Sequence, residues 1–185
     1  TDFGDLTVAR QDSASCASSV RGVWAGGDAL NVIDYITFAS AGNAVDFGDL
    51  TVARNYLSGC SNNVRGLING GYTSVYVNII EYVTIASVGN AVDFGDLTVA
   101  TGATASLASS TRSVVGGGQT AVDYTNAITY VTISSTGNSA SFGALTSPRG
   151  FFAGCASATR GLFGGAAESG VNKNTIEYVT IATTG

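Results

Sequence analysis

Residues 46–54 read Asp-Phe-Gly-Asp-Leu-Thr-Val-Ala-Arg, and the chain contains four copies of this segment, two of them identical and two altered. The same nine residues run from Asp2 to Arg10, eight of them recur from Asp93, and a degenerate copy begins at Ser141. The copies begin 44, 47 and 48 residues apart. Self-similarity at such a period is typical of repeat proteins, in which each repeat is one supersecondary unit. We therefore expect residues 1–185 to form a single domain of four repeats, starting near residues 2, 46, 93 and 141.

Each repeat predicts four strands and no helix. The Asp-Phe-Gly-Asp-Leu-Thr segment alternates with period two, which is a strand signal. A run of small residues follows, with Cys16, Cys60, Leu107 or Cys155 at its centre, and then a strand that ends in a Gly doublet. The last segment, for example residues 33–38, is β-branched and aromatic and is apolar on both alternating faces. A strand of that kind belongs to a sheet that is covered on both sides.

Four short strands per repeat, in sheets that are apolar on both faces, are typical of a β-propeller. The small-residue strands are expected to be innermost, because only small side chains fit where four strands converge on a narrow axis. The sequence thus predicts an all-β fold, a four-bladed β-propeller with four antiparallel strands per blade.

The two ends of the sequence predict how the ring closes. The last repeat stops soon after Ile181, where an Asp-Phe-Gly strand would follow, and residues 1–7 contain such a strand. We therefore expect the N-terminal strand to complete the last blade, which would remove the two exposed strand edges of an open ring.

The order of these motifs resembles the kelch repeat, in which a Gly-Gly doublet ends the second strand, a Tyr lies in the third and a Trp in the fourth. The doublets are Gly26-Gly27, Gly70-Gly71 and Gly117-Gly118, with Gly165-Ala166 in the last repeat. The tyrosines are Tyr35, Tyr82, Tyr130 and Tyr178, and the place of the Trp is taken by Phe3, Phe47, Phe94 and Phe142. The resemblance implies a kelch-like propeller.

The sequence Asp-Phe-Gly-Asp-Leu-Thr is also similar to repeats in structural and tail-associated proteins of marine bacteriophages. That resemblance implies a virion-associated or extracellular protein and identifies no ligand.

Composition and charge exclude several classes of function. The net charge is −5 and the cations are scattered, so the chain lacks the basic patch of a nucleic-acid-binding protein. No apolar run approaches the ~18 residues of a membrane helix. The chain has no His, the commonest general base and metal ligand, and three Cys, an odd number that argues against a disulfide framework. We expect no cofactor and no metal.

The repeated carboxylate pairs, such as Asp46 and Asp49, have two interpretations. In the first they cap turns or pair with Arg between blades; in the second they form a site for a hard cation, which takes six or more oxygen ligands. The three cysteines likewise suggest either small buried apolar groups at one level around the axis or a soft-metal site. The structural interpretation is favoured in both cases.

Length and sequence vary mainly in two places of each repeat, after the Gly doublet and after the Arg position. In a propeller, both connections emerge on the same face, and insertions on one face often mark a binding side. Unpatterned aromatic residues and carboxylates there are the candidate ligand-binding residues: Tyr56, Tyr72, Tyr76, Tyr124, Phe151, Phe152, Asp28 and Asp123.

These features favour a non-enzymatic recognition or structural module that binds a glycan or a protein through one loop face, as a monomer or as part of a larger assembly. One alternative is a hydrolase or lyase on that face, which would use Asp12, Asp28 or Asp123. The absence of His and of any nucleophile–base spacing argues against it. Another alternative is a structural spacer without a ligand.

Overall fold

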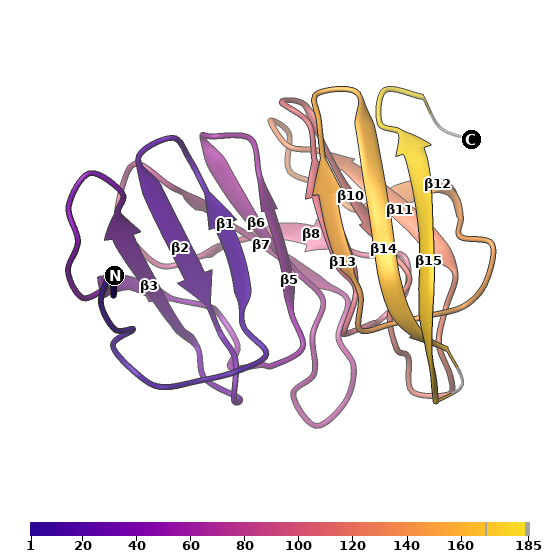
Figure 1. The fold of residues 1–185 in the computed structure, drawn as a ribbon, viewed down its shortest axis with the longest axis horizontal. Helices are drawn as coiled ribbons and strands as arrows, with labels where there is room; N and C mark the ends of the chain where they lie inside the picture. Colours follow the sequence, from indigo (N-terminus) through magenta and orange to yellow (C-terminus); the bar gives the residue numbers. More distant parts are fainter. Residues whose placement is uncertain (169, 184–185) are drawn as a thin grey trace.

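Antiparallel strands build the whole regular structure of the computed structural model, which describes residues 1–168 and 170–183. The strands form four sheets arranged as the blades of a four-bladed β-propeller, as predicted (Figure 1). No helix occurs in this part of the chain, and hence none of the length and hydropathy needed to cross a membrane.

Each blade follows the order of its strands along the chain. Blade 1 contains β1 (Ala14–Ala17), β2 (Arg21–Ala25), β3 (Val32–Thr37) and β4 (Val45–Asp49). Blade 2 contains β5 (Ser58–Ser61), β6 (Arg65–Asn69), β7 (Ile79–Thr84) and β8 (Val92–Asp96). Blade 3 contains β9 (Ala105–Ala108), β10 (Arg112–Gly116), β11 (Ala127–Thr132) and β12 (Ala140–Ala144). Blade 4 contains β13 (Ala153–Ala156), β14 (Arg160–Glu168) and β15 (Val171–Thr180).

The small-residue strands β1, β5, β9 and β13 lie side by side in that order and form the inner wall, as expected. Their backbones approach so closely that a Cβ on Gly59 would lie 2.3 Å from the Ser15 carbonyl oxygen. Across this wall the Ser58 hydroxyl forms hydrogen bonds of 2.6 Å with the hydroxyls of Thr104 and Ser106. The composition of the inner strand therefore follows from the width of the axis.

Neighbouring blades pack face to face. We call the side of a blade that meets the next blade its front face, and the opposite side its back face. On the front face of blade 1, Ile33 is buried and Tyr35 meets Phe47 edge to face at 5.8 Å between ring centroids. This face packs against Ile68, Val83 and Ile85 on the back face of blade 2 in one buried cluster. The same arrangement recurs between blades 2 and 3 and between blades 3 and 4.

Arginines at the start of the second strand hold these faces together. Arg21 lies 4.5 Å from the centre of the Tyr35 ring and donates a hydrogen bond of 3.0 Å to the Ile85 carbonyl of the next blade. Arg65 and Arg112 repeat both contacts in blades 2 and 3. Each arginine thus combines a cation–π contact within its own blade with a hydrogen bond to the next one.

The Gly-Asn pairs connect the third and fourth strands, and they also contact the preceding blade. The N–H of Gly89 donates to the Phe47 carbonyl at 2.7 Å, and the Asn90 side chain accepts from the Asp49 N–H. A Cβ on Gly48 would lie 2.6 Å from the Gly89 backbone, so the fourth strand needs a glycine there. This explains why Phe-Gly-Asp and Gly-Asn recur together.

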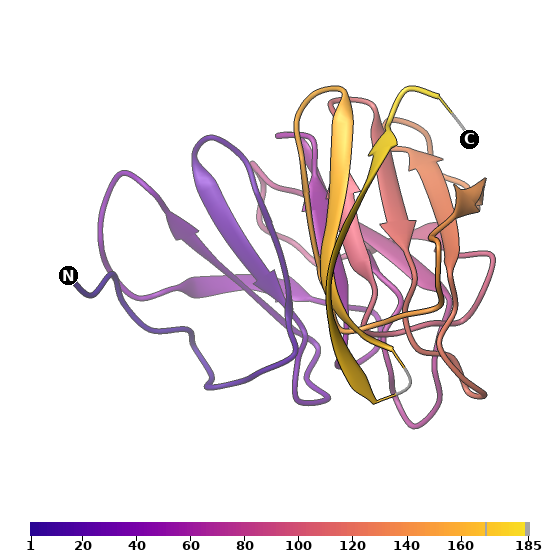
Figure 2. The ribbon, with the colours of Figure 1, turned by 45° about the vertical axis from the view of Figure 1, so that its right-hand side comes forward.

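The predicted closure of the ring is wrong. The last sheet contains three strands in the described residues, and residues 1–7 form no strand in it. The N-terminal segment lies against blade 1 instead, where the N–H groups of Gly42 and Ala44 donate to the carbonyls of Phe3 and Asp5. In both views the N-terminal segment lies at the left, next to blade 1, and β15 lies well to its right, away from it (Figures 1 and 2). The segment therefore occupies the place on blade 1 that β4 occupies on blade 2.

Replacing Phe47 with Ala tests the blade core. Because this ring is 2% exposed and lies between two blades, Phe47→Ala should lower the free energy of unfolding by about 3–5 kcal/mol in chemical denaturation. The matched control is Phe151→Ala, at a ring that is 49% exposed, which should change stability by less than about 1 kcal/mol. Equal effects of the two changes would refute the placement of Phe47.

Candidate functional site

Four loops, one from each repeat, meet at one end of the axis and surround a hollow of about 400 Å³. Asp12, Tyr56, Ala103 and Phe151 line it, and each follows the Arg10, Arg54, Thr101 or Arg149 position by two residues. All four have left-handed backbone conformations, with φ values of 57°, 55°, 53° and 55°. Such conformations are uncommon for residues other than Gly, and for large residues they are costly.

Backbone hydrogen bonds connect three of these residues, Tyr56, Ala103 and Phe151. The N–H of Ala103 donates to the Tyr56 carbonyl at 2.8 Å, and the N–H of Phe151 donates to the Ala103 carbonyl at 2.9 Å. Adjacent repeats are thus connected through the left-handed residues themselves. Because the constraint comes from the main chain, side chains as different as Asp, Tyr, Ala and Phe occupy the same position. The hollow is therefore a preformed site with variable lining.

An aromatic cluster lies at this end of the molecule. Phe151 meets Tyr56 at 5.7 Å and Tyr124 at 6.5 Å between ring centroids, with edge-to-face geometry in both pairs. Tyr72 and Tyr76 form a further pair at 5.1 Å. Burial, together with the neighbouring Tyr72, Tyr56 and Tyr124, raises the pKa of the Tyr76 hydroxyl above its usual value. The two sets of variable loops therefore share one face, as the sequence predicts.

Glycines position two of these rings on the next repeat. A Cβ on Gly102 would lie 3.2 Å from the ring of Tyr76, and a Cβ on Gly150 would lie 3.0 Å from the ring of Tyr124. The ring of each tyrosine thus rests on the backbone of the following repeat. This packing limits their movement and makes the aromatic surface rigid.

The remaining candidate residues have different surroundings. Phe152 lines the hollow but also packs against Phe163 of blade 4, with ring centroids 5.9 Å apart. The Asp28 carboxylate accepts a hydrogen bond from the Gln11 N–H, and the Asp123 carboxylate accepts one from the Tyr124 N–H. Both carboxylates are exposed and neither lines the hollow; Asp28 bonds to the loop that carries Asp12, and Asp123 bonds within its own loop.

Two lining positions, Asp12 and Ala103, are absent from the aromatic set predicted from the sequence. The available signal was position rather than residue type, since each lies two residues after an Arg10-equivalent position. Aromatic residue type identifies Tyr56 and Phe151 but not Asp12 and Ala103, which occupy the same position in their repeats.

Buried ion pairs lie next to this site, and they correct one prediction. The arginines do not pair with the repeated Asp-x-x-Asp carboxylates. Arg10 contacts Asp34 at 2.9 Å, Arg54 contacts Glu81, and Arg149 contacts Glu177. Each pair joins an arginine that follows one repeat segment to a carboxylate in the third strand of the next blade. Burial lowers the pKa of Arg54, although the Glu81 charge and hydrogen bond oppose this shift.

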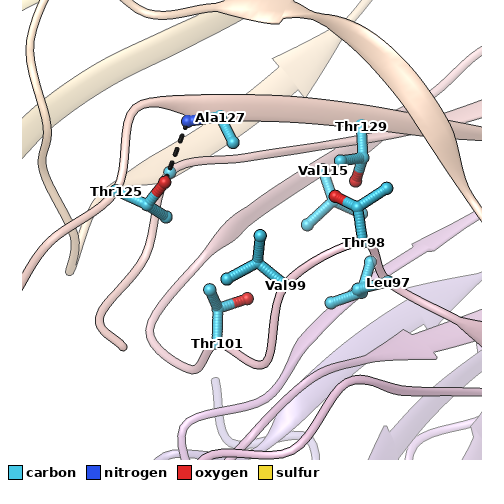
Figure 3. A pocket seen from close by; sticks show the side chains of 9 residues that line it. Leu97, Thr98, Val99, Thr101, Val115, Thr125, Ala127 and Thr129 are labelled. Atoms are coloured by element: carbon cyan, nitrogen blue, oxygen red, sulfur yellow. Dashed lines mark hydrogen bonds between the residues drawn. The ribbon is translucent and has the colours of Figure 1, made fainter. Parts of the chain in front are cut away.

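The third repeat has lost both partners together. Thr101 replaces the arginine and Thr129 replaces the carboxylate, and both side chains are buried. Both threonines line a cavity of about 10 Å³. Figure 3 shows their side chains around it, together with those of Thr98 and Val99. An unpaired buried charge is strongly destabilising, so losing both partners costs less than losing one. The repeat therefore keeps either both charges or neither.

Glu177 responds to three effects. Burial alone would raise the pKa of its carboxyl group, but hydrogen bonds from the Thr146 hydroxyl and N–H and the charge of Arg149 lower it below the usual Glu value. A lowered pKa in the folded state stabilises the fold above the pKa of the unfolded chain. That contribution is lost as the pH falls through the lowered value.

The cysteines lie at equivalent positions of the inner strands, but their thiols do not face a common centre. Cys16 packs between blades 1 and 2, Cys60 is 3.0 Å from the Ser113 hydroxyl between blades 2 and 3, and Cys155 is exposed. Burial raises the pKa of Cys16 to about 12 and that of Cys60 to about 11. Across residues 1–168 and 170–183, no group of three or more His, Cys, Asp or Glu is arranged to hold a metal ion.

The ion pair of the second blade can be tested by copying the third repeat. Either Arg54→Thr or Glu81→Thr leaves a buried charge without its partner and should destabilise the protein by about 3–5 kcal/mol. The double variant R54T/E81T should recover most of this loss, because the two changes reproduce the Thr101–Thr129 arrangement. Chemical denaturation of all four proteins in a double-mutant cycle measures the coupling, and additive losses would contradict the interpretation.

Thiol reactivity tests the placement of the cysteines. A thiol reagent at pH 8 should modify one cysteine per native chain rapidly, Cys155, because the raised pKa keeps the half-buried Cys16 and the buried Cys60 protonated. Unfolding the chain should release all three. Rapid modification of two or more thiols in the native protein would disprove this arrangement, and Cys155→Ser provides the control.

Searches against models of protein families and against curated proteins found no match to this chain. Because propeller folds have many unrelated functions, the fold alone does not select one. The function must therefore be inferred from the residues at the axial hollow.

Proposed function

We propose that this protein is a non-enzymatic recognition module that binds a neutral carbohydrate in the axial hollow. The observation that carries the proposal is the aromatic lining by Tyr56 and Phe151, held in left-handed conformations around about 400 Å³ of open space. Ligand sites are concave, mostly apolar and aromatic, with a few polar groups that fix orientation. Asp12, Ser13 and Thr104 supply such polar groups in the same lining.

The chemistry of the rim suits a sugar. Tyrosine and phenylalanine rings provide flat apolar surfaces, while the tyrosine hydroxyl remains available for hydrogen bonding. Edge-to-face packing of Tyr56 on Phe151, and of Tyr124 on the same ring, limits the motion of these side chains. A rigid site loses less conformational entropy when a ligand binds. The net charge of −5 favours a neutral glycan over a sulfated or phosphorylated one.

The finer classification is part of the same proposal. We place the repeats among kelch-like propellers, because Tyr35, Tyr82 and Tyr130 each meet a phenylalanine of the fourth strand at 5.8–6.0 Å. These ring pairs match the third-strand Tyr and fourth-strand aromatic residue of that repeat. The resemblance of the Asp-Phe-Gly-Asp-Leu-Thr segment to marine bacteriophage repeats supports a role in the surface apparatus of such a particle. A glycan-binding face would contact the host there.

Truncation of the two central rings tests this function. A glycan-array screen identifies a ligand, and titration of that ligand should then show that Tyr56→Ala and Phe151→Ala each weaken binding about tenfold or more. Alanine is compatible with the backbone here, because Ala103 occupies the same position with φ 53°. Val64→Ala, in the turn at the other end of β5, is the matched control and should leave affinity unchanged.

The other functions give different results in the same experiments. A hydrolase or lyase would convert the bound glycan, with products visible by mass spectrometry and lost in Asp12→Asn. A spacer would bind nothing on the array. Saturable binding that Tyr56→Ala and Phe151→Ala leave intact would refute the proposed site.

A further inference from the structure

The first and last blades expose the two halves of an interface that the molecule builds three times internally. Ile33, Ile80 and Ile128 on the front faces of blades 1–3 are 0–2% exposed, whereas the equivalent Ile176 of blade 4 is 71% exposed. Leu162 and Tyr178 on the same face are also exposed. On the back faces, Ile85, Ile133 and Ile181 are at most 1% exposed, whereas Phe38 of blade 1 is 48% exposed.

The exposed back face of blade 1 forms an apolar hollow of about 340 Å³. Its lining includes Phe3, Leu6, Trp24, Ile36, Phe38 and Ala44. By repeat position these correspond to Phe47, Leu50, Ile68, Val83, Ile85 and Ala91, which are all buried in the cluster between blades 1 and 2. That cluster is completed by Val23, Ile33 and Tyr35 from the front face of blade 1. Their counterparts in blade 4 are Leu162, Ile176 and Tyr178, so each end lacks what the other exposes.

The backbone at the two ends is complementary as well. β3, β7 and β11 each pair with a fourth strand, whereas β15 pairs with β14 alone in the described sheet. The N-terminal segment contacts blade 1 through the same type of hydrogen bond that joins β4 to blade 2, at 2.7 Å in both cases. The other edge of the N-terminal segment corresponds to the edge through which β4 pairs with β3. An unpaired strand edge readily accepts another strand.

We propose that blade 4 of one copy binds the N-terminal segment and the back face of blade 1 of a second copy, head to tail. A second copy is the favoured occupant because the matching surfaces of one chain, on blade 4 and on blade 1, lie apart and stay exposed (Figures 1 and 2). The internal register places Gly48, Gly95 and Gly143 opposite Ile33, Ile80 and Ile128. The same register puts Gly4 of the second copy opposite Ile176.

Arg160 adds a polar contact to this interface. It lies 4.7 Å from the centre of the Tyr178 ring, as Arg21, Arg65 and Arg112 lie on their own tyrosines. Those three donate to the carbonyls of Ile85, Ile133 and Ile181 in the following blade. By the same geometry Arg160 donates to the Phe38 carbonyl of the second copy. The contact is heterologous, because it joins two different surfaces. Repeated from copy to copy it builds a chain of subunits, which stops growing only if it closes into a ring.

Two charge substitutions at opposite ends test the proposal with the full chain. The mass of the wild-type protein in light scattering after size exclusion should rise with concentration. Ile176→Glu disrupts the front face of blade 4, and Phe38→Glu disrupts the back face of blade 1. Each variant alone should be monomeric, and an equimolar mixture should form a heterodimer that does not grow further, because each partner keeps one intact face. Val122→Glu, at a side chain that is 96% exposed, should assemble like the wild type.

Other results would overturn the inference. A wild-type protein that remains monomeric across the micromolar range, with Ile176→Glu and Phe38→Glu only lowering its melting temperature, would indicate closure within one chain. Assembly that both variants retain would place the contact elsewhere. Circular dichroism confirms that each variant is folded, and Arg160→Ala provides a milder change, which should weaken association without abolishing it.

Discussion

Face-to-face packing between blades is the interaction on which the rest of the structure depends. Each sheet is apolar on both sides, so no blade buries its side chains by itself. The front face of one blade supplies an isoleucine and a tyrosine–phenylalanine pair, and the back face of the next supplies aliphatic side chains. This dependence on neighbours is the general property of repeat folds, whose stability is the sum of unit and interface contributions. It also explains why the exposed faces at the two ends are the exceptional surfaces of the molecule.

The charged groups between the blades also join one repeat to the next. Charges buried there occur in pairs that join one repeat to the next, as with Arg54 and Glu81. In the third repeat Thr101 replaces the arginine and Thr129 replaces the carboxylate, and the cavity that both line is about 10 Å³. Since each pair adjoins the left-handed residue two positions later, the ion pairs also support the loops that surround the hollow.

Much of this architecture could be predicted from the sequence, because it follows from local patterns. The period of the repeat, the alternation around Phe47 and the small residues around Cys60 specified the strands, their number per blade in the first three blades and the inner wall. The closure could not be predicted, because residues 1–7 match the edge of β15 and the side of blade 1 equally well in sequence. The partner of each arginine was also missed, since Asp34 and Glu81 belong to another strand than the more conspicuous Asp-x-x-Asp pairs. In the site, residue type identified the aromatic rim, whereas Asp12 and Ala103 belong to the same set by their position in the repeat and their backbone conformation.

The left-handed position in each repeat separates conformation from chemistry. Main-chain hydrogen bonds connect Tyr56, Ala103 and Phe151 in successive loops, and the same backbone conformation accommodates an acid, a phenol, a methyl group and a phenyl ring. Four neighbouring positions around one hollow can therefore change with little effect on the packed sheets below. A scaffold of this kind can acquire new ligands by single substitutions, much as antibody loops do on a constant framework.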